Sequence, residues 1–456
     1  MSNHEPPVPP PAFLSSSRPT LNTVLYLATL SRLLTWLLAY LCNLFVDDYD
    51  SASDTILPPL SSFPLVNYFA RPALAVILRW DAFYFLHIAE EGYVYEQEHA
   101  FFPLVPALAR VVARIVWLLS DRYAILIAGA LIANISFVLA AGALYRLTYA
   151  IYPTQPRLAF LTAVAYIITP SGMFMTAFYT ESPFALLTFW GMYEWARGRN
   201  WQAAVAWGMA GFVRSNAVVY IGFFVWDGTV MWFKDRRLYG FQSMISHLFT
   251  TICCSLMVLC GFVGFQWYGY QEYCVDFTPV RPWCNATAPL LYNWSTCCHG
   301  KGKPYALLTT QTPYRNNGFL RYYEIKQIPN FLFAAPMIGL SFVGIYSYAR
   351  HDWRRFLTLG LRSCLNSTTT SPYHTNARLL PFVYLWLVLV LYCVTNMHVQ
   401  VITRFFSSVP GVYWFVAEVW SGAQEKHGWA DKVMTRYFVL YAMVGVILFA
   451  NFFPPA

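Results

Sequence analysis

The segment 79–103 carries a dense set of side chains that could do chemistry, in a chain otherwise poor in charge. It opens with Arg79, Trp80 and Asp81, and further acids and histidines follow at short intervals: His87, Glu90, Glu91, Glu96, Glu98 and His99. Apolar residues flank the segment, which predicts a position at the edge of a membrane. Because ionisable groups are costly to place there, such a cluster usually has a functional reason. We therefore predict that this segment carries out catalysis.

Asp81 is the residue of this segment best suited to act as a general base. It follows the apolar stretch 72–78 and precedes the aromatic residues 83–85, so it is expected at the membrane interface. Partial burial there would strengthen the pull of its carboxylate on the proton of an alcohol. An ion pair with Arg79 is the alternative, and spacing alone does not decide between the two.

The other acids and histidines of the segment could hold a metal or bind hydroxyl groups. Carboxylates and imidazoles are standard metal ligands, but their spacing here matches no zinc or calcium motif. We therefore expect no metal. We predict instead that the cluster forms hydrogen bonds to a polyhydroxylated ligand, with Tyr93 and Tyr95 as stacking surfaces; its members are His87, Glu90, Glu91, Glu96, Glu98 and His99. The sequence contains no glycine-rich phosphate loop, nucleophile elbow or CxxC pair.

Further polar residues lie in later segments, at positions expected to be at or inside the membrane. They are Glu181, Arg214, Asn216, His398, Gln400 and Arg404, with Arg321, Gln327 and Asn330 leading into another apolar segment. Arg214 and Arg404 suit a lipid phosphate, which needs a cation at the interface. The alternative is that Glu181 only neutralises one of these arginines.

The composition is that of a membrane protein. Of 456 residues, 57% are apolar and 11% are charged, against about 45–50% and about 25% in ordinary soluble domains. Repeated long apolar runs indicate transmembrane helices, because the hydrocarbon layer is about 30 Å thick. The net charge of +8 comes mainly from bases in short connectors. This is the positive-inside pattern, and it predicts no nucleic-acid partner.

We predict a single all-α transmembrane domain, 21–456, with about eleven membrane spans. The expected spans are 21–45, 123–145, 158–177, 182–196, 201–217, 219–233, 246–268, 329–349, 379–397, 404–420 and 435–452. With a cytosolic N-terminus, the basic connectors are cytosolic and the long polar loops 46–122 and 269–328 are luminal. This holds if 104–119 stays on the membrane surface as an amphipathic helix.

Residues 1–20 are rich in proline and indicate a disordered cytosolic arm. The loop 269–328 holds four cysteines and two glycosylation acceptors: Cys274, Cys284, Cys297, Cys298, Asn285 and Asn293. Together they indicate an oxidising, luminal loop with one or two disulfide bonds, whose pairing stays open. Free thiols and unmodified acceptors are the alternative.

Several motifs together resemble the GPI mannosyltransferase II family, also called PIG-V. Arg79-Trp-Asp81, His87-Ile-Ala-Glu-Glu-Gly-Tyr93 and Glu96-Gln-Glu-His-Ala-Phe-Phe-Pro103 resemble its first luminal loop. Other blocks follow in the family's order: Phe178-Tyr-Thr-Glu-Ser-Pro183, Arg214-Ser-Asn216, Arg281-Pro-Trp-Cys284, Gly318-Phe-Leu-Arg-Tyr322, Gln327-Ile-Pro-Asn-Phe331 and His398-Val-Gln-Val-Ile-Thr-Arg404. The sequence departs from the family pattern at 314–317, and its register is loose over 301–314.

The resemblance implies an endoplasmic-reticulum enzyme of the GT-C class, a helical bundle whose luminal loops carry short interfacial helices. Such an enzyme transfers the second mannose, in α-1,6 linkage, from dolichol phosphate mannose to the glycosylphosphatidylinositol (GPI) precursor. Because the donor is β-linked and the product α-linked, the implied reaction inverts the anomeric centre without a covalent intermediate.

The resemblance also implies roles for individual residues. Asp81 would take the acceptor proton, and the leaving phosphate would be faced by Arg404, Arg321 and His398. Acceptor hydroxyls would be positioned by Glu96, His99 and Glu181. Fungal members of the family have a small membrane partner, so an accessory subunit is a candidate partner beside the membrane lipids and the two lipid-linked substrates.

Two other classes of function stay open. A multi-pass transporter or lipid flippase would also show many spans, basic connectors and buried ionisable residues. It gives no reason for the acidic and aromatic first loop, and no two-fold repeat is evident. The second class is a non-catalytic scaffold of a GPI-assembly complex, in which case Asp81→Asn would leave mannosylation intact.

Overall fold

The computed structural model describes residues 20–49, 53, 56–60, 62–115, 121–235, 241–275, 319, 320, 322–362, 371–422 and 428–453. Every regular element in these ranges is a helix, so the all-α prediction is confirmed for the described residues. The expected disordered arm falls almost wholly outside these ranges, as does most of the second polar loop.

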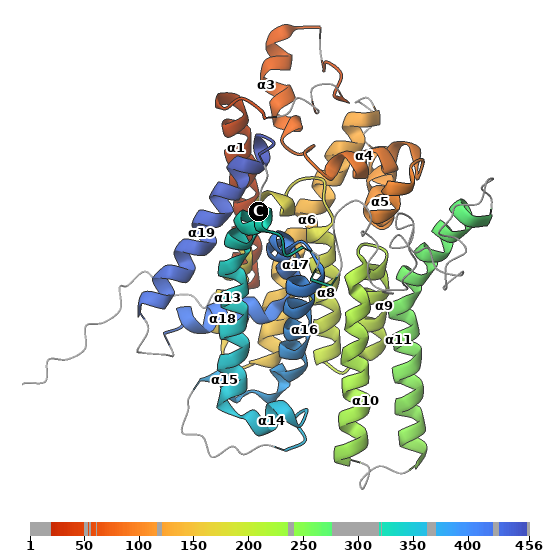
Figure 1. Ribbon diagram of the computed structural model, residues 1–456, viewed down its shortest axis with the longest axis vertical. Coiled ribbons are helices and arrows are strands. Elements are labelled where there is room, and N and C mark those ends of the chain that lie inside the picture. Colours follow the sequence, from red (N-terminus) through yellow and green to blue (C-terminus); the bar gives the residue numbers. More distant parts are fainter. Residues whose placement is uncertain are drawn as a thin grey trace, which may run out of the picture.

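Six helices of the described residues are long and apolar enough to cross a membrane. They are α1 (Leu21–Phe45), α6 (Asp121–Ile151), α11 (Phe241–Tyr270), α13 (Ile328–His351), α16 (Leu380–Asn396) and α19 (Gly428–Ala450). Figure 1 shows most of them running roughly along the long axis of the molecule, beside the shorter α8 (Glu181–Ala196), α9 (Asn200–Gly211) and α10 (Ile221–Asp235).

Five of the eleven expected spans correspond to helices that are not among these six long ones, so a count of about eleven spans is not confirmed. The span expected over 158–177 is α7 (Pro156–Ile167) followed by the 3-10 helix η3 (Gly172–Met175), and the break contains Pro170. Proline disfavours helical backbone in the residue before it, which ends α7 here. The span expected over 404–420 is divided in the same way, into α17 (Ile402–Phe405), η10 (Phe406–Ser408) and α18 (Pro410–Trp420).

The first polar loop folds into short helices at one end of the bundle, drawn at the top of Figure 1. They are α3 (Pro64–Ala75), α4 (Ala82–Glu91), η2 (Glu96–Ala100) and α5 (Leu104–Ala113). With 10 residues, α5 is about 15 Å long, about half the hydrocarbon thickness. It is therefore too short to cross a membrane alone, which agrees with the expectation of a helix on the membrane surface.

Other short elements connect the long helices. They are η4 (Ser215–Tyr220), the π-helix η5 (Gln271–Val275), η7 (Ile325–Gln327), α14 (Trp353–Leu357), α15 (Pro372–Thr375), η8 (Ala377–Leu379) and η9 (Val399–Val401). In Figure 1, α14 lies at the end of the bundle opposite to α4 and α5. The topology predicted from the sequence likewise assigns α14 to one side of the membrane and α4 and α5 to the other.

Close backbone packing fixes the helix that leads into the site. A Cβ atom on Gly261 of α11 would lie 2.6 Å from the carbonyl oxygen of Gly208 in α9. Only glycine allows the two backbones to approach so closely, a common device between membrane helices. The end of α9 is therefore held in place, and the polar turn at Arg214–Asn216 follows directly after it.

Candidate active site

The backbone around Asp81 is strained and clamped. Trp80, just before it, has a φ angle of 54°, which is unfavourable for a residue with a bulky side chain. The hydroxyl of buried Tyr179 accepts a hydrogen bond from the Asp81 N–H at 3.0 Å and donates one to the Arg79 carbonyl oxygen at 3.0 Å. Tyr179 thus holds the chain on both sides of Trp80 and fixes the direction of the Asp81 side chain.

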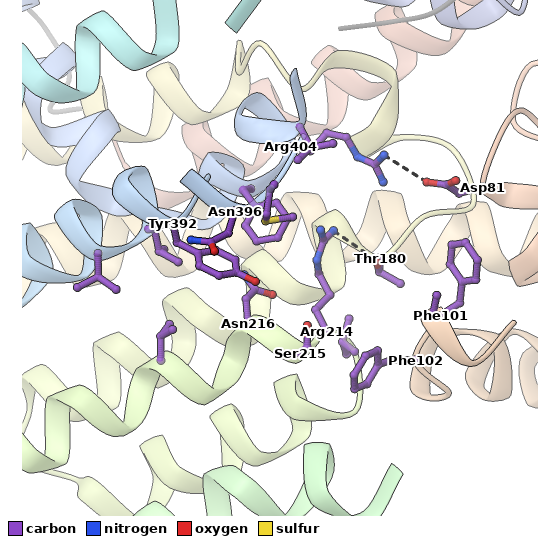
Figure 2. Close-up of a pocket in the computed structure, with 18 of the residues that line it drawn as sticks. Asp81, Phe101, Phe102, Thr180, Arg214, Ser215, Asn216, Tyr392, Asn396 and Arg404 are labelled. Atoms are coloured by element: carbon purple, nitrogen blue, oxygen red, sulfur yellow. Dashed lines mark hydrogen bonds and ion pairs between the residues drawn. The ribbon is translucent and has the colours of Figure 1, made fainter. Parts of the chain in front are cut away.

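Asp81 directly precedes helix α4, at a position where aspartate usually caps the helix by accepting a backbone hydrogen bond. No such side-chain cap is formed here. Instead, Oδ2 of Asp81 lies 3.2 Å from Nη1 of Arg404, as Figure 2 shows. The carboxylate is 17% exposed, so it is available to a ligand in the adjoining cavity.

Glu181 joins Arg404 to a second arginine. Its Oε1 atom lies 2.7 Å from both Nε and Nη2 of Arg404 and 2.8 Å from Nη1 of Arg214. The Glu181 side chain is 0% exposed, whereas both arginines are partly open. Four charged residues that are far apart in the sequence are therefore brought into one network: Asp81, Arg404, Glu181 and Arg214.

A cavity of about 210 Å³ adjoins this network. Its polar lining comes from Asp81, Thr180, Arg214, Ser215, Asn216, Asn396 and Arg404. Most of the remaining wall is apolar or aromatic, including Phe85, Phe101, Phe102, Val219, Val388, Leu389 and Phe405. In Figure 2, Asp81 lies at one end of the drawn residues, Tyr392 and Asn396 lie toward the other, and the arginines lie between. The site can hold a ligand that has both polar and apolar parts.

The histidines of the first loop make contacts within the loop or with α11. Nδ1 of His87 lies 2.5 Å from Oε1 of Glu98, a nearly buried carboxylate. His99 is 0% exposed and stacks on Phe265, with ring centroids 4.4 Å apart. Burial lowers the pKa of His99 to about 4, so the ring is neutral at ordinary pH. Neither histidine lines the cavity.

Other predicted site residues of the first loop also lie outside the cavity lining. Arg79 is fully buried and contacts Oδ2 of Asp48 at 2.8 Å and Oγ of Ser53. The Tyr93 hydroxyl donates to the Phe101 carbonyl oxygen at 2.7 Å. Trp80 is 37% exposed, Glu91 is exposed, and Glu96 is half-buried on η2.

A second polar cluster gathers four more predicted residues around one tyrosine. The Tyr322 hydroxyl donates to Oε1 of Gln400 at 3.0 Å and accepts from Nδ2 of Asn330 at 2.7 Å. Asn330 also donates to Oε1 of Gln327 at 2.6 Å. The rings of Tyr322 and His398 have centroids 4.4 Å apart. His398 and Gln400 of this cluster follow directly after Asn396 and Met397 of the cavity wall along the chain.

Several predicted residues lie outside the described ranges: Arg321, Cys284, Cys297, Cys298, Asn285 and Asn293. Cys274 is described and is disulfide-bonded, and its pairing stays a prediction. Within the part of the chain that the structure describes, no three His, Cys, Asp or Glu side chains group in a way that could hold a metal ion.

Sequence reasoning did not select the two tyrosines that organise the site, Tyr179 and Tyr322. Both are buried, and by residue type they are indistinguishable from tyrosines of the core. The available signal was their place within two of the blocks that resemble the family, 178–183 and 318–322. Tyr392 and Asn396 of the cavity wall were missed because they end an ordinary apolar helix.

A crystal structure of the Archaeoglobus fulgidus oligosaccharyltransferase in the apo form has a similar arrangement of helices, with a TM-score of 0.49 and 11% sequence identity. The similarity covers 96% of this chain and 57% of that chain.

Sequence relatives are more similar and match at nearly full length. The GPI alpha-1,6-mannosyltransferase 2 of Cricetulus griseus is 31% identical over 506 residues, covering 96% of this chain and 99% of the relative. The Homo sapiens protein of the same name is also 31% identical over the same shares. The GPI mannosyltransferase 2 of Gibberella zeae is 31% identical, covering 90% of this chain and 92% of the relative. The family described as "Mannosyltransferase (PIG-V)" matches residues 21–456, and the chain belongs to this family.

Proposed function

We propose that this chain transfers the second mannose of the GPI anchor, in α-1,6 linkage, from dolichol phosphate mannose to the GPI precursor. Family membership and the names of full-length relatives support a GPI mannosyltransferase. The observation that carries the mechanism is that a partly open carboxylate, Asp81, and two arginines, Arg404 and Arg214, line the same cavity, with Asp81 in contact with Arg404.

In the proposed reaction, Asp81 accepts the proton of the 6-hydroxyl of the first mannose as that oxygen attacks the anomeric carbon. The bond from the anomeric carbon to the phosphate oxygen breaks, and dolichol phosphate leaves with the electron pair. Attack opposite to the leaving group inverts the β-linked donor to an α-linked product. Arg404 and Arg214 stabilise the charge that develops on the phosphate, so no metal is required.

The apolar part of the cavity supports a lipid-linked donor. Val388 lines the cavity and is also 53% exposed on α16, one of the six long apolar helices. The cavity therefore opens beside a helix suited to the hydrocarbon layer, where a polyprenyl chain can lie. We further propose that the site faces the lumen of the endoplasmic reticulum, with a small accessory membrane subunit as a candidate partner.

The experiment is to incubate the purified chain with dolichol phosphate mannose, a one-mannose GPI precursor and excess EDTA, and to determine the linkage of the product by NMR. We expect an α-1,6-linked product from the unaltered chain and from Asp121→Asn. Asp121 is an exposed aspartate at the start of α6, outside the cavity lining, and so serves as the control for the Asp81→Asn variant.

Three results would contradict the proposal. A β-linked product would exclude inversion, and strict dependence on Mn²⁺ would exclude the metal-free mechanism. Movement of lipid between membrane leaflets without any new glycosidic bond would instead support a transporter or flippase.

A further inference from the structure

We propose that Glu181 is a positioning residue, which orients Arg404 and Arg214 toward a single phosphate-binding position. When the phosphate binds Arg404 in place of Asp81, the contact between Glu181 and Arg404 is retained. This inference rests on the proposed function, because it assumes that the ligand between the arginines is the donor phosphate.

The burial of Glu181 argues against direct contact with a sugar. Its side chain is 0% exposed, and it is not among the residues that line the cavity. The two arginines that it contacts do line the cavity, with side chains 18% and 17% exposed. Glu181 therefore lies behind the guanidinium groups and can act on a ligand only through them.

Aromatic rings restrict the same two guanidinium groups. Arg404 lies over the ring of Phe174, 4.3 Å from its centroid. Arg214 lies 5.1 Å from the ring centroid of Phe405. Ring contact and the shared carboxylate oxygen together leave little freedom to either arginine. The pair is thus preorganised as a cationic wall, which is the arrangement that favours an anion at the moment of reaction.

The charges show which contact a phosphate would replace. Two arginines and two carboxylates sum to zero, so an incoming phosphodiester anion must compete with one carboxylate for Arg404. The contact to Asp81 is longer, at 3.2 Å, and its carboxylate is partly exposed. Both contacts to Glu181 are 2.7 Å, and the Glu181 side chain is fully buried. The phosphate therefore displaces Asp81 and leaves the contact to Glu181 in place.

This exchange couples donor binding to the base. While Arg404 occupies Oδ2 of Asp81, that oxygen is engaged in an ion pair. Once the phosphate takes the guanidinium, Arg404 no longer competes for Oδ2, which can then accept the proton of the acceptor hydroxyl. The base is therefore available after the donor has bound, so the donor should bind before the acceptor reacts.

The test compares Glu181→Gln and Glu181→Asp with a matched control, Glu194→Gln. Glu194 is also a nearly buried carboxylate of α8 in contact with an arginine, Arg199 at 3.4 Å, but it does not line the cavity. KM is measured separately for dolichol phosphate mannose and for the GPI precursor, and product inhibition by dolichyl phosphate reports on the phosphate and its lipid without the sugar. Thermal unfolding in detergent checks that each variant is folded.

For Glu181→Gln we expect the donor KM and the inhibition constant of dolichyl phosphate to rise together by about 10- to 100-fold, the range of one hydrogen bond to a charged group. The precursor KM should stay within about twofold, Glu181→Asp should give an intermediate value, and the control should match the unaltered chain. If Glu181→Gln does not fold, Glu181→Asp carries the test because it keeps the charge and shortens the reach.

Two results would overturn the inference: a change in the precursor KM with an unchanged donor KM, or no change in either. The proposed function fails separately. If Asp81→Asn abolishes transfer while Glu181→Gln binds the donor normally, only the inference on Glu181 is wrong. If Asp81→Asn transfers mannose normally, the proposed base is wrong whatever Glu181 does.

Discussion

Replacing Arg404 by lysine keeps the positive charge and removes the fork of the guanidinium group. In the structure this group makes three contacts to two carboxylates: one to Asp81 at 3.2 Å and two to Glu181 at 2.7 Å. A lysine ammonium is a point charge on a flexible stem and cannot reproduce a planar, two-sided arrangement. Arg404→Lys should therefore satisfy one carboxylate at a time.

The size of the effect follows from the contacts that are lost. In the proposed reaction Arg404 exchanges Asp81 for the donor phosphate, so lysine loses at least one charge-assisted hydrogen bond to that phosphate, worth about 1.5–3 kcal/mol. The lower half of this range is the better choice, because Arg404 is 18% exposed and water can replace part of the contact. About 2 kcal/mol corresponds to a fall of about 30-fold in kcat/KM.

The assay is mannose transfer by purified Arg404→Lys, with Arg436→Lys as the control. Arg436 is an exposed arginine of α19 outside the cavity lining, so its replacement should leave kcat/KM unchanged. If Arg404→Lys transferred mannose as well as the unaltered chain, the fork would have no role, and Arg404 could be treated as a simple counter-charge.

Three further perturbations separate catalytic from structural roles. Tyr179→Phe removes the hydroxyl that holds the backbone on both sides of Trp80, so kcat should fall about tenfold for the loss of about 1–1.5 kcal/mol, and an unchanged kcat would argue against the clamp. Arg79→Met breaks the ion pair between buried Arg79 and Asp48, which is 19% exposed. This change should lower the free energy of unfolding by about 2–3 kcal/mol, and the folded protein should keep the donor KM of the unaltered chain. Burial lowers the pKa of His99 to about 4 from the ordinary histidine value of about 6.5. The unfolded chain therefore binds a proton first, and stability is lost as pH falls below about 6.5. Between pH 7 and pH 5 this amounts to about 2 kcal/mol, and denaturant unfolding of His99→Phe should lack that loss; an equal loss in both proteins would contradict the assignment.

The residues of the charged network were identifiable from the sequence, but their arrangement was not. Asp81, Glu181, Arg214 and Arg404 stand out because charges are costly beside apolar segments. Which carboxylate contacts which arginine depends on how α4, α8, η4 and α17 pack, and these elements are far apart in the chain. The expected alternatives each named one pair, whereas Glu181 contacts both arginines.

The long helices were also predictable, whereas the interrupted ones were not. An apolar run as long as 158–177 satisfies the length criterion for a span whether or not the helix is continuous. The break at Pro170 and Gly172 follows from backbone geometry, because Gly172 has a φ angle of 47°. Hydropathy alone does not register such a break, and the six long helices of the described residues do not confirm the predicted count of about eleven spans.

The central claim is that the Asp81 carboxylate removes the proton of the acceptor hydroxyl. Its most direct test is the single-turnover rate of mannose transfer by Asp81→Asn, preloaded with dolichol phosphate mannose and mixed with GPI precursor in EDTA. We expect the rate to fall by about 10²- to 10⁴-fold, the usual contribution of a general base, while the donor stays bound. A rate equal to that of the unaltered chain would contradict the claim.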